Sequence, residues 1–168
     1  MNDSFWHKRW ASNRIGFHQT EINPYLKEHW HRLNLEQAAP VLVPLCGKSN
    51  DLLWLNNLGH PVVGVELSPI AIKAFFEENG MPPGTLDEKP FTISQHNGLK
   101  LLCGDFFSLS PEDMHHVCAV YDRASLITFP PEIRIRYARH LGDLLKPGAR
   151  MLLITIDYPQ HEMEGPPF

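Results

Sequence analysis

The chain has 168 residues, of which 43% are hydrophobic, and this is enough for one globular domain. The formal net charge of −4 and the lack of a Lys/Arg cluster exclude the charge pattern of a nucleic-acid-binding protein. The polar start MNDSFWHKRW does not resemble a signal peptide, and no apolar run approaches the roughly 20 residues that span a bilayer. Three cysteines without a CxxC spacing favour a reducing compartment. We therefore expect a cytoplasmic protein with no nucleic-acid or membrane partner.

Ten histidines raise the question of a metal site. His29 and His31 are two positions apart, and His115 and His116 are adjacent. Neither pair has the i, i+4 spacing that brings two ligands to one face of a helix. We expect loop and surface histidines, and no metal site.

The first forty residues are rich in aromatic side chains, and we expect residues 1–40 to form a cap on the rest of the domain. Within this cap, Asn23-Pro24 predicts the start of a helix, with asparagine as the N-cap and proline at the first helical position.

From residue 41 onward, apolar strands alternate with helices. Strands are predicted at Val41–Leu45, Val62–Leu67, Phe91–Gln95, Leu99–Cys103, Val117–Asp122 and Arg150–Asp157, with a hairpin turn at Asn97-Gly98. Helices are predicted at Asp51–Leu58, from Ser68-Pro69 to Gly80, and at Pro130–Leu145, while the Pro/Gly-rich segment Met81–Pro90 is expected to be a loop. This alternation predicts an α/β domain over 1–168, with residues 41–168 forming a doubly wound, mainly parallel sheet.

Sheets of this kind bind ligands beyond the carboxyl ends of their strands, where the strand order reverses. The turn after the first strand, Leu45–Ser49, is therefore the first place to look for a site. Gly47 would let a ligand approach the backbone closely, and Glu66 follows nineteen residues later, at the end of the second strand. A carboxylate at this spacing accepts hydrogen bonds from ribose hydroxyls in related folds. The pattern indicates an adenosine-containing cofactor.

The number of glycines discriminates between two such cofactors. A dinucleotide site has three glycines in a GxGxxG turn that surrounds a pyrophosphate, whereas the turn PLCGKS has one. S-adenosylmethionine carries no phosphate, so the turn favours this methyl donor over NAD. Lys48 is the counter-argument, since a lysine beside a glycine turn could bind phosphate; it could also be an exposed lysine in an ordinary strand–helix turn.

Two further strand ends carry candidate site residues. Asp105 could accept a hydrogen bond from an adenine amino group while Phe106 packs on the ring, or it could simply begin a turn. Asp122 and Arg123 end the fourth strand and are expected to face the ligand crevice, although a structural ion pair that fixes the loop is the alternative.

With these residues identified, the chain resembles the bacterial thiopurine S-methyltransferases along its whole length. The matching stretches are FWHKRW and IGFHQ within residues 5–19, NPYL (23–26), VLVPLCGKS (41–49), GHPVVGVELS (59–68), CGDFF (103–107), YDRAS (121–125) and EGPPF (164–168). PLCGKS, YDRAS and GPPF are far more specific than a glycine-turn pattern.

The resemblance implies a Rossmann-like class I methyltransferase with S-adenosylmethionine as donor and aromatic or heterocyclic thiols, such as thiopurines, as acceptors. Some bacterial relatives are linked to the methylation of selenium or tellurium compounds. The residues implied in cofactor binding are Trp10, Leu45, Glu66 and Arg123, with Trp6, Asp105 and Phe106 as further contacts and Phe17 beside the acceptor. We expect a monomer.

The expected chemistry is direct transfer of the methyl group, with Cys46 as a packing residue and no covalent nucleophile. Asp122 could accept a proton from a neutral thiol, and Arg123 could stabilise an anionic acceptor or the carboxylate of the donor. A nicotinamide-dependent oxidoreductase and a non-catalytic cofactor-binding module are the alternative functions.

The resemblance also implies a difference in length. Family members normally continue for several dozen residues past GPPF and gain two further strands, so we expect this chain to be a fragment whose fifth core strand is an open sheet edge.

Overall fold

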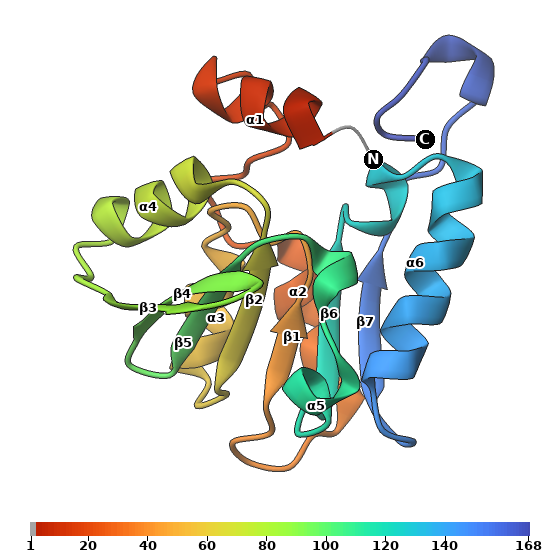
Figure 1. The fold of residues 1–168 in the computed structure, drawn as a ribbon. Helices are drawn as coiled ribbons and strands as arrows, with labels where there is room; N and C mark the ends of the chain where they lie inside the picture. The colour runs from red at the N-terminus through yellow and green to blue at the C-terminus, as the bar shows by residue number, and fades with distance from the viewer. Residues whose placement is uncertain (1–2) are drawn as a thin grey trace.

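The computed structural model describes residues 3–168. Its described strands form one seven-stranded sheet in the order β3-β4-β5-β2-β1-β6-β7 (Figure 1). The strands are β1 (Val41–Val43), β2 (Val62–Glu66), β3 (Gly84–Glu88), β4 (Phe91–His96), β5 (Leu99–Cys103), β6 (Ala119–Arg123) and β7 (Arg150–Ile154). The predicted α/β class with a mainly parallel sheet is confirmed, since only the β3–β4 and β4–β5 pairs are antiparallel.

The central strand β1 defines the point where the strand order reverses. It pairs in parallel with β2 on one side and with β6 on the other, so that Val41 lies opposite both Val62 and Ala119. The chain therefore leaves β1 first to one side, for β2, and later to the other, for β6 and β7, and the carboxyl ends of β1, β2 and β6 meet at one end of the sheet. This is the arrangement that places a ligand crevice beyond those ends.

Helices cover both faces of the sheet (Figure 1). They are α1 (Asp3–Ala11), α2 (Pro24–His29), α3 (Asp51–Asn57), α4 (Pro69–Glu78), α5 (Pro111–Met114) and α6 (Pro131–Leu144). Side chains of β1 alternate between the faces: Val41 and Val43 join the core under α2, α3 and α4, whereas Leu42 joins the core under α5 and α6. The sheet is thus buried on both sides, which explains why its central strands are continuously apolar.

Two helix starts follow the rules read from the sequence. The side chain of Asn23 accepts hydrogen bonds from the backbone N–H groups of Tyr25 and Leu26 at 3.0 and 3.3 Å, with Pro24 at the first helical position of α2. Ser68 caps α4 by accepting from the N–H of Ala71 at 3.4 Å. These caps fix the places where the chain turns away from the carboxyl ends of the strands.

The prediction that Met81–Pro90 forms a loop is wrong. This segment contains β3, which pairs antiparallel with β4 and places Leu86 opposite Ile93. All five residues of β3 are exposed, so the strand has no alternation of buried and exposed side chains to reveal it. It forms because its backbone groups pair with the edge of β4, an interaction that leaves little trace in a sequence.

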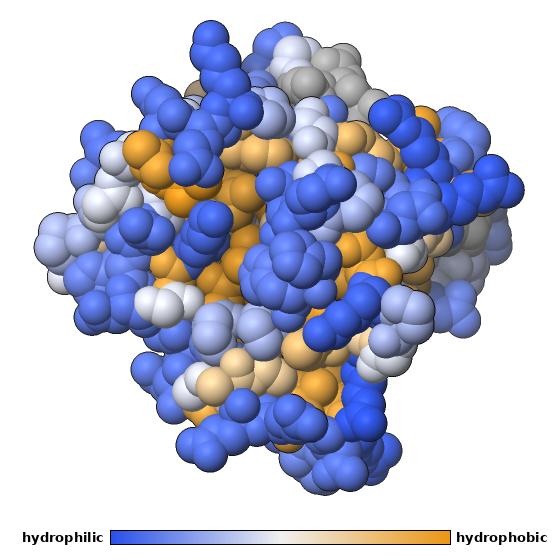
Figure 2. Space-filling model, turned by 60° about the horizontal axis from the view of Figure 1, so that its bottom comes forward, coloured by the Kyte–Doolittle hydropathy of each residue, from blue (hydrophilic) through white to orange (hydrophobic). Residues whose placement is uncertain are grey.

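The opposite edge of the sheet is β7, as expected for the fifth core strand. Met151 and Leu153 are 38% and 42% exposed there. The end of the molecule turned forward in Figure 2 shows hydrophilic side chains around recessed apolar areas. Within residues 3–168, no helix is both long and apolar enough to cross a membrane.

Replacing Gly64 in β2 by alanine is expected to destabilise the protein by about 1–3 kcal/mol. The added Cβ would lie 2.5 Å from Cδ2 of Leu101 and 2.8 Å from Sγ of Cys46. Urea unfolding followed by circular dichroism measures the loss. Gly142→Ala on the exposed side of α6 is the matched control, because nothing outside its own helix lies within 4 Å of its added Cβ. We expect G142A to gain about 0.5–1 kcal/mol, and a G64A variant as stable as the parent would contradict the close packing.

Candidate functional site

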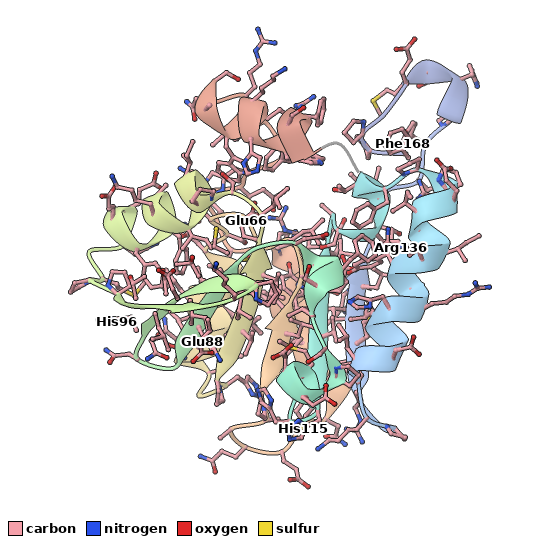
Figure 3. All side chains as sticks on the ribbon, viewed as in Figure 1. Glu66, Glu88, His96, His115, Arg136 and Phe168 are labelled. Atoms are coloured by element: carbon pink, nitrogen blue, oxygen red, sulfur yellow. The ribbon has the colours of Figure 1, made fainter. Side chains whose placement is uncertain are left out.

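A cavity of about 510 Å³ opens beyond the carboxyl ends of β1, β2 and β6, a volume suited to a small organic ligand. Its wall includes seven of the residues predicted from the sequence, Trp6, Trp10, Phe17, Leu45, Gly47, Glu66 and Arg123. Glu66 lies at the α1 side of β2, whereas Glu88, His96 and His115 lie away from this end of the sheet (Figure 3). The structure therefore brings most of the predicted site together.

The turn after β1 supplies one side of the cavity. Leu45 and Gly47 both have positive φ angles, +47° and +55°. A Cβ on residue 47 would lie 3.2 Å from the indole ring of Trp10, so a side chain there would meet both backbone strain and a close contact. Glycine is required at position 47 because the turn curls tightly beneath α1.

The Glu66 carboxylate is held beside this turn by backbone donors. Its Oε2 accepts from the N–H of Gly47 at 2.9 Å, and its Oε1 accepts from the N–H of Ser68 at 2.8 Å. Each oxygen of an ionised carboxylate has two lone pairs, so each can still accept from a ligand hydroxyl. Burial raises the pKa of Glu66, while the backbone hydrogen bonds oppose that shift.

At the end of β6, Arg123 reaches the cavity from the other side of β1. Its Nε lies 3.3 Å from Oδ2 of Asp51, and the same oxygen accepts a 2.8 Å hydrogen bond from the hydroxyl of Tyr121. Oδ1 of Asp51 accepts from the backbone N–H of Asn23 at 2.8 Å. Burial and the neighbouring Asp51 raise the pKa of Tyr121, so its hydroxyl stays protonated as a donor.

Aromatic rings from the N-terminal segment form the roof of the cavity. Phe17 packs edge-to-face against Trp6 and Trp10, with ring centroids 5.8 and 5.6 Å apart. Trp10 is buried, and Figure 1 shows α1 lying across the end of the sheet. These rings offer flat apolar surface to a ligand that lies between α1 and the strand ends.

Two cationic or titratable side chains also line the cavity. Lys48 forms a 2.6 Å ion pair with Glu78 of α4, and its charge is thus compensated without a phosphate. Burial and the nearby Lys48 lower the pKa of His18, which favours a neutral imidazole. Among residues 3–168, no group of three or more His, Cys, Asp or Glu side chains could hold a metal ion.

Three predicted site residues lie outside this wall. The Asp105 side chain caps the N–H of Phe107 at 3.0 Å, and Phe106 is buried against Tyr137 at a ring distance of 5.1 Å. The fully buried Asp122 accepts hydrogen bonds from the N–H of Ser125 at 3.0 Å and the hydroxyl of Tyr137 at 2.7 Å. The expectation that Asp122 faces the crevice is corrected: its carboxylate points into the core under α6 and fixes the loop after β6.

Several cavity residues were not identified from the sequence. Tyr121 begins the matched stretch YDRAS but was not predicted as a site residue, and Ile156, Pro166 and Pro167 follow the last strand, where no periodic pattern marks them. The resemblance did include Pro166 and Pro167 in its EGPPF match, which is the one signal that pointed to this segment. The backbone N–H of Phe168 donates to the carbonyl of Ile127 at 2.9 Å and so ties the segment to the cavity wall.

Comparison with solved structures identifies the fold class. The DhpI–SAM–HEP complex matches 97% of this chain and 70% of its own at a TM-score of 0.60 and 17% identity. A 1,6-didemethyltoxoflavin N1-methyltransferase from Burkholderia thailandensis, bound to S-adenosylhomocysteine, matches 86% of this chain and 56% of its own at 0.61 and 17%. The fold is therefore the Rossmann-like fold of S-adenosylmethionine-dependent methyltransferases.

Sequence comparison specifies the family. The model of the family "Thiopurine S-methyltransferase (TPMT)" matches residues 1–168. The thiopurine S-methyltransferases of Pseudomonas fluorescens strain Pf0-1 and Marinobacter nauticus are 52% and 48% identical over the whole chain, which covers 77% of each. This chain belongs to the thiopurine S-methyltransferase family, and it is an S-adenosylmethionine-dependent methyltransferase.

The environment of Cys46 predicts that its thiol reacts slowly. Cys46 is buried, and its burial, followed by the nearby Glu66, raises the pKa of its thiol well above the ordinary range. Only a thiolate reacts readily with iodoacetamide, so we expect Cys46 to be alkylated at least about tenfold more slowly than Cys118 in the folded protein. Peptide mass spectrometry measures both rates. Labelling of Cys46 as fast as the partly exposed Cys118 would show that the thiol is accessible and activated.

Proposed function

We propose that this protein transfers the methyl group of S-adenosylmethionine to the sulfur of small aromatic or heterocyclic thiols such as thiopurines. The observation that carries the proposal is the Glu66 carboxylate, held beside a one-glycine turn in a cavity that has an aromatic roof. The family supports the substrate class, because its named members in Pseudomonas and Marinobacter are thiopurine S-methyltransferases. Selenols are chemically close to thiols, and we include them among the candidate acceptors.

The described residues fit the methyl donor. Glu66 keeps lone pairs for two ribose hydroxyls, and Gly47 lines the cavity beside it, so that the nucleoside would lie next to this turn. Arg123 offers a guanidinium for the carboxylate of the donor. Lys48 is already paired with Glu78, which weakens the case for a pyrophosphate and hence for a nicotinamide cofactor.

The aromatic roof gives the acceptor its place. Phe17 is 37% exposed and lies on the cavity wall, where it can stack against a flat heterocycle. Trp6 and Trp10 hold Phe17 through edge-to-face contacts, and a ring face near a sulfonium adds a cation–π attraction of about 0.5–2 kcal/mol. In this proposal the roof both excludes water and orients the acceptor.

The bound donor supplies an activated methyl group, because its sulfonium is a good leaving group. The acceptor reacts as a thiolate that has lost its proton to solvent, so no protein base is needed, and S-adenosylhomocysteine would be the leaving product. The protein has to hold the acceptor sulfur in line with the methyl group in a dry site, and such positioning can lower a barrier by about 7–11 kcal/mol. Cys46 is not required as a nucleophile, since its thiol is buried and protonated. Asp122 has a structural role here, because its carboxylate already accepts from Ser125, Leu126 and Tyr137 inside the core.

The direct test is a transfer assay with S-adenosylmethionine labelled in its methyl group. We expect labelled methyl sulfides from thiopurines and thiophenols, and none from the same compounds with the sulfur already methylated. Selenol acceptors are tested in parallel. Binding of S-adenosylhomocysteine without transfer to any thiol would instead support a non-catalytic cofactor-binding module.

The pKa of Glu66 leads to a pH prediction. A ribose hydroxyl needs the ionised carboxylate as acceptor, and burial raises this pKa from its ordinary value of 4.5. Affinity for S-adenosylhomocysteine is therefore complete above the raised pKa and falls as the pH drops through it, beginning closer to neutrality than for an exposed glutamate. Isothermal titration calorimetry at a series of pH values measures this fall.

Two variants test the proposed role of Glu66 in binding the ribose. Glu66→Gln should weaken binding by roughly tenfold or more, because a hydrogen bond to a charged group contributes about 1.5–3 kcal/mol, and its residual binding should lose the acid-dependent fall. Glu77→Gln is the matched control, since Glu77 lies on the exposed face of α4 and pairs with Lys73 at 3.7 Å. If E66Q kept the same fall in affinity at acid pH, another group would be responsible.

A further inference from the structure

A buried carboxylate behind the cavity wall connects two parts of the site. Asp51 begins α3, and it is only 2% exposed. It holds three donors from distant parts of the chain, namely the backbone of Asn23, the hydroxyl of Tyr121 and the guanidinium of Arg123. A buried charge with this set of partners is costly to remove, because each partner would lose its acceptor.

The geometry of the ion pair orients the arginine. The closest approach to Asp51 is made by Nε of Arg123, at 3.3 Å. An arginine held through Nε keeps the N–H donors of its two terminal Nη groups for other partners. Arg123 lines the cavity and its side chain is 16% exposed, whereas Asp51 lies behind the wall that Tyr121 and Arg123 form. No other carboxylate pairs with this guanidinium within residues 3–168. The outer end of the guanidinium is thus free to bind an anionic group in the cavity.

The side-chain conformation of Asp51 is fixed by its hydrogen bonds. Its own backbone N–H donates to Oγ of Ser49 at 3.2 Å, in the turn that lines the cavity. Both side-chain oxygens are engaged, Oδ1 by Asn23 and Oδ2 by Tyr121 together with Arg123. A carboxylate fixed on both oxygens is a rigid anchor, and a rigid anchor restricts the rotamers of a long arginine side chain before any ligand arrives.

We propose that Asp51 is the positioning residue of the site, which presents Arg123 to the carboxylate of the methyl donor without touching the ligand itself. This inference rests on the proposed role of Arg123 in donor binding. It assigns to Asp51 a contribution to affinity that is transmitted through Arg123, and not through the N-terminal segment, to which Asp51 is bonded at Asn23.

A double-mutant cycle on the full chain tests the proposal, with the affinity for S-adenosylhomocysteine measured by calorimetry. Asp51→Asn removes the charge and turns an amide N–H toward donors, so we expect affinity to fall on the order of tenfold. In an Arg123→Met background, the same D51N change should have almost no further effect. Equal losses in both backgrounds would overturn the proposal, because a purely structural defect or a loosened N-terminal segment does not require Arg123.

Matched variants separate stability from positioning. His60→Phe removes a buried imidazole before the amino end of β2, at the other end of the sheet from the cavity; this ring accepts from Nε1 of Trp30 at 3.3 Å and is hydrogen-bonded to the carbonyl of Ala39 at 2.8 Å. It should lose stability, as D51N does, but keep the affinity of the parent protein. If D51N does not fold, Asp51→Glu replaces it: the charge remains but the anchor point shifts, and the cycle with Arg123→Met is interpreted in the same way. Loss of affinity in H60F equal to that in D51N or D51E would contradict the proposal.

The single variant Arg123→Met separates this inference from the function on which it rests. If R123M binds S-adenosylhomocysteine as the parent does, the proposed role of Arg123 in donor binding fails, and the positioning role fails with it. If R123M binds more weakly while D51N and D51E bind normally, only the role of Asp51 is wrong.

Discussion

The parallel pairing of β1 with both β2 and β6 is the constraint on which the site depends. Because the carboxyl ends of these three strands lie side by side, the Gly47 turn, Glu66 and Arg123 converge although they are far apart in the chain. The hydrogen bond from Gly47 to Glu66 and the ion pair between Arg123 and Asp51 then fix the polar groups on the two sides of β1. The position of the cavity thus follows from the strand order, and the two buried carboxylates hold its polar groups in place.

The two carboxylates act in different ways. Glu66 lies on the cavity wall and retains capacity to accept hydrogen bonds, so in the proposed function it contacts the ligand directly. Asp51 uses both oxygens within the protein and can influence a ligand only through its neighbours. Asp122 shows a third outcome, since a carboxylate one residue from Arg123 faces the opposite side of the sheet and holds a loop. Alternation along β6 explains this last case, because it places Asp122 on the face of the sheet opposite to Tyr121 and Arg123.

How far the sequence alone predicts this structure depends on the kind of pattern that a segment carries. The buried parallel strands and the caps at Asn23 and Ser68 were predicted because their physical causes are local. β3 was missed because an exposed edge strand depends on its neighbour and not on its own side chains. Asp122 was placed in the crevice because a two-residue alternation cannot be phased when both faces of a strand are buried. Asp51 was read only as the start of a helix, since its partners come from residues 23, 121 and 123.

The close contact between the Trp10 indole and Gly47 has a consequence for observing the protein. The indole ring lies against the very turn that would border a bound nucleoside, and a Cβ at position 47 would already touch it. Any shift of that backbone on ligand entry alters the surroundings of a buried indole. The fluorescence of Trp10 should therefore report binding of the donor beside the Gly47 turn.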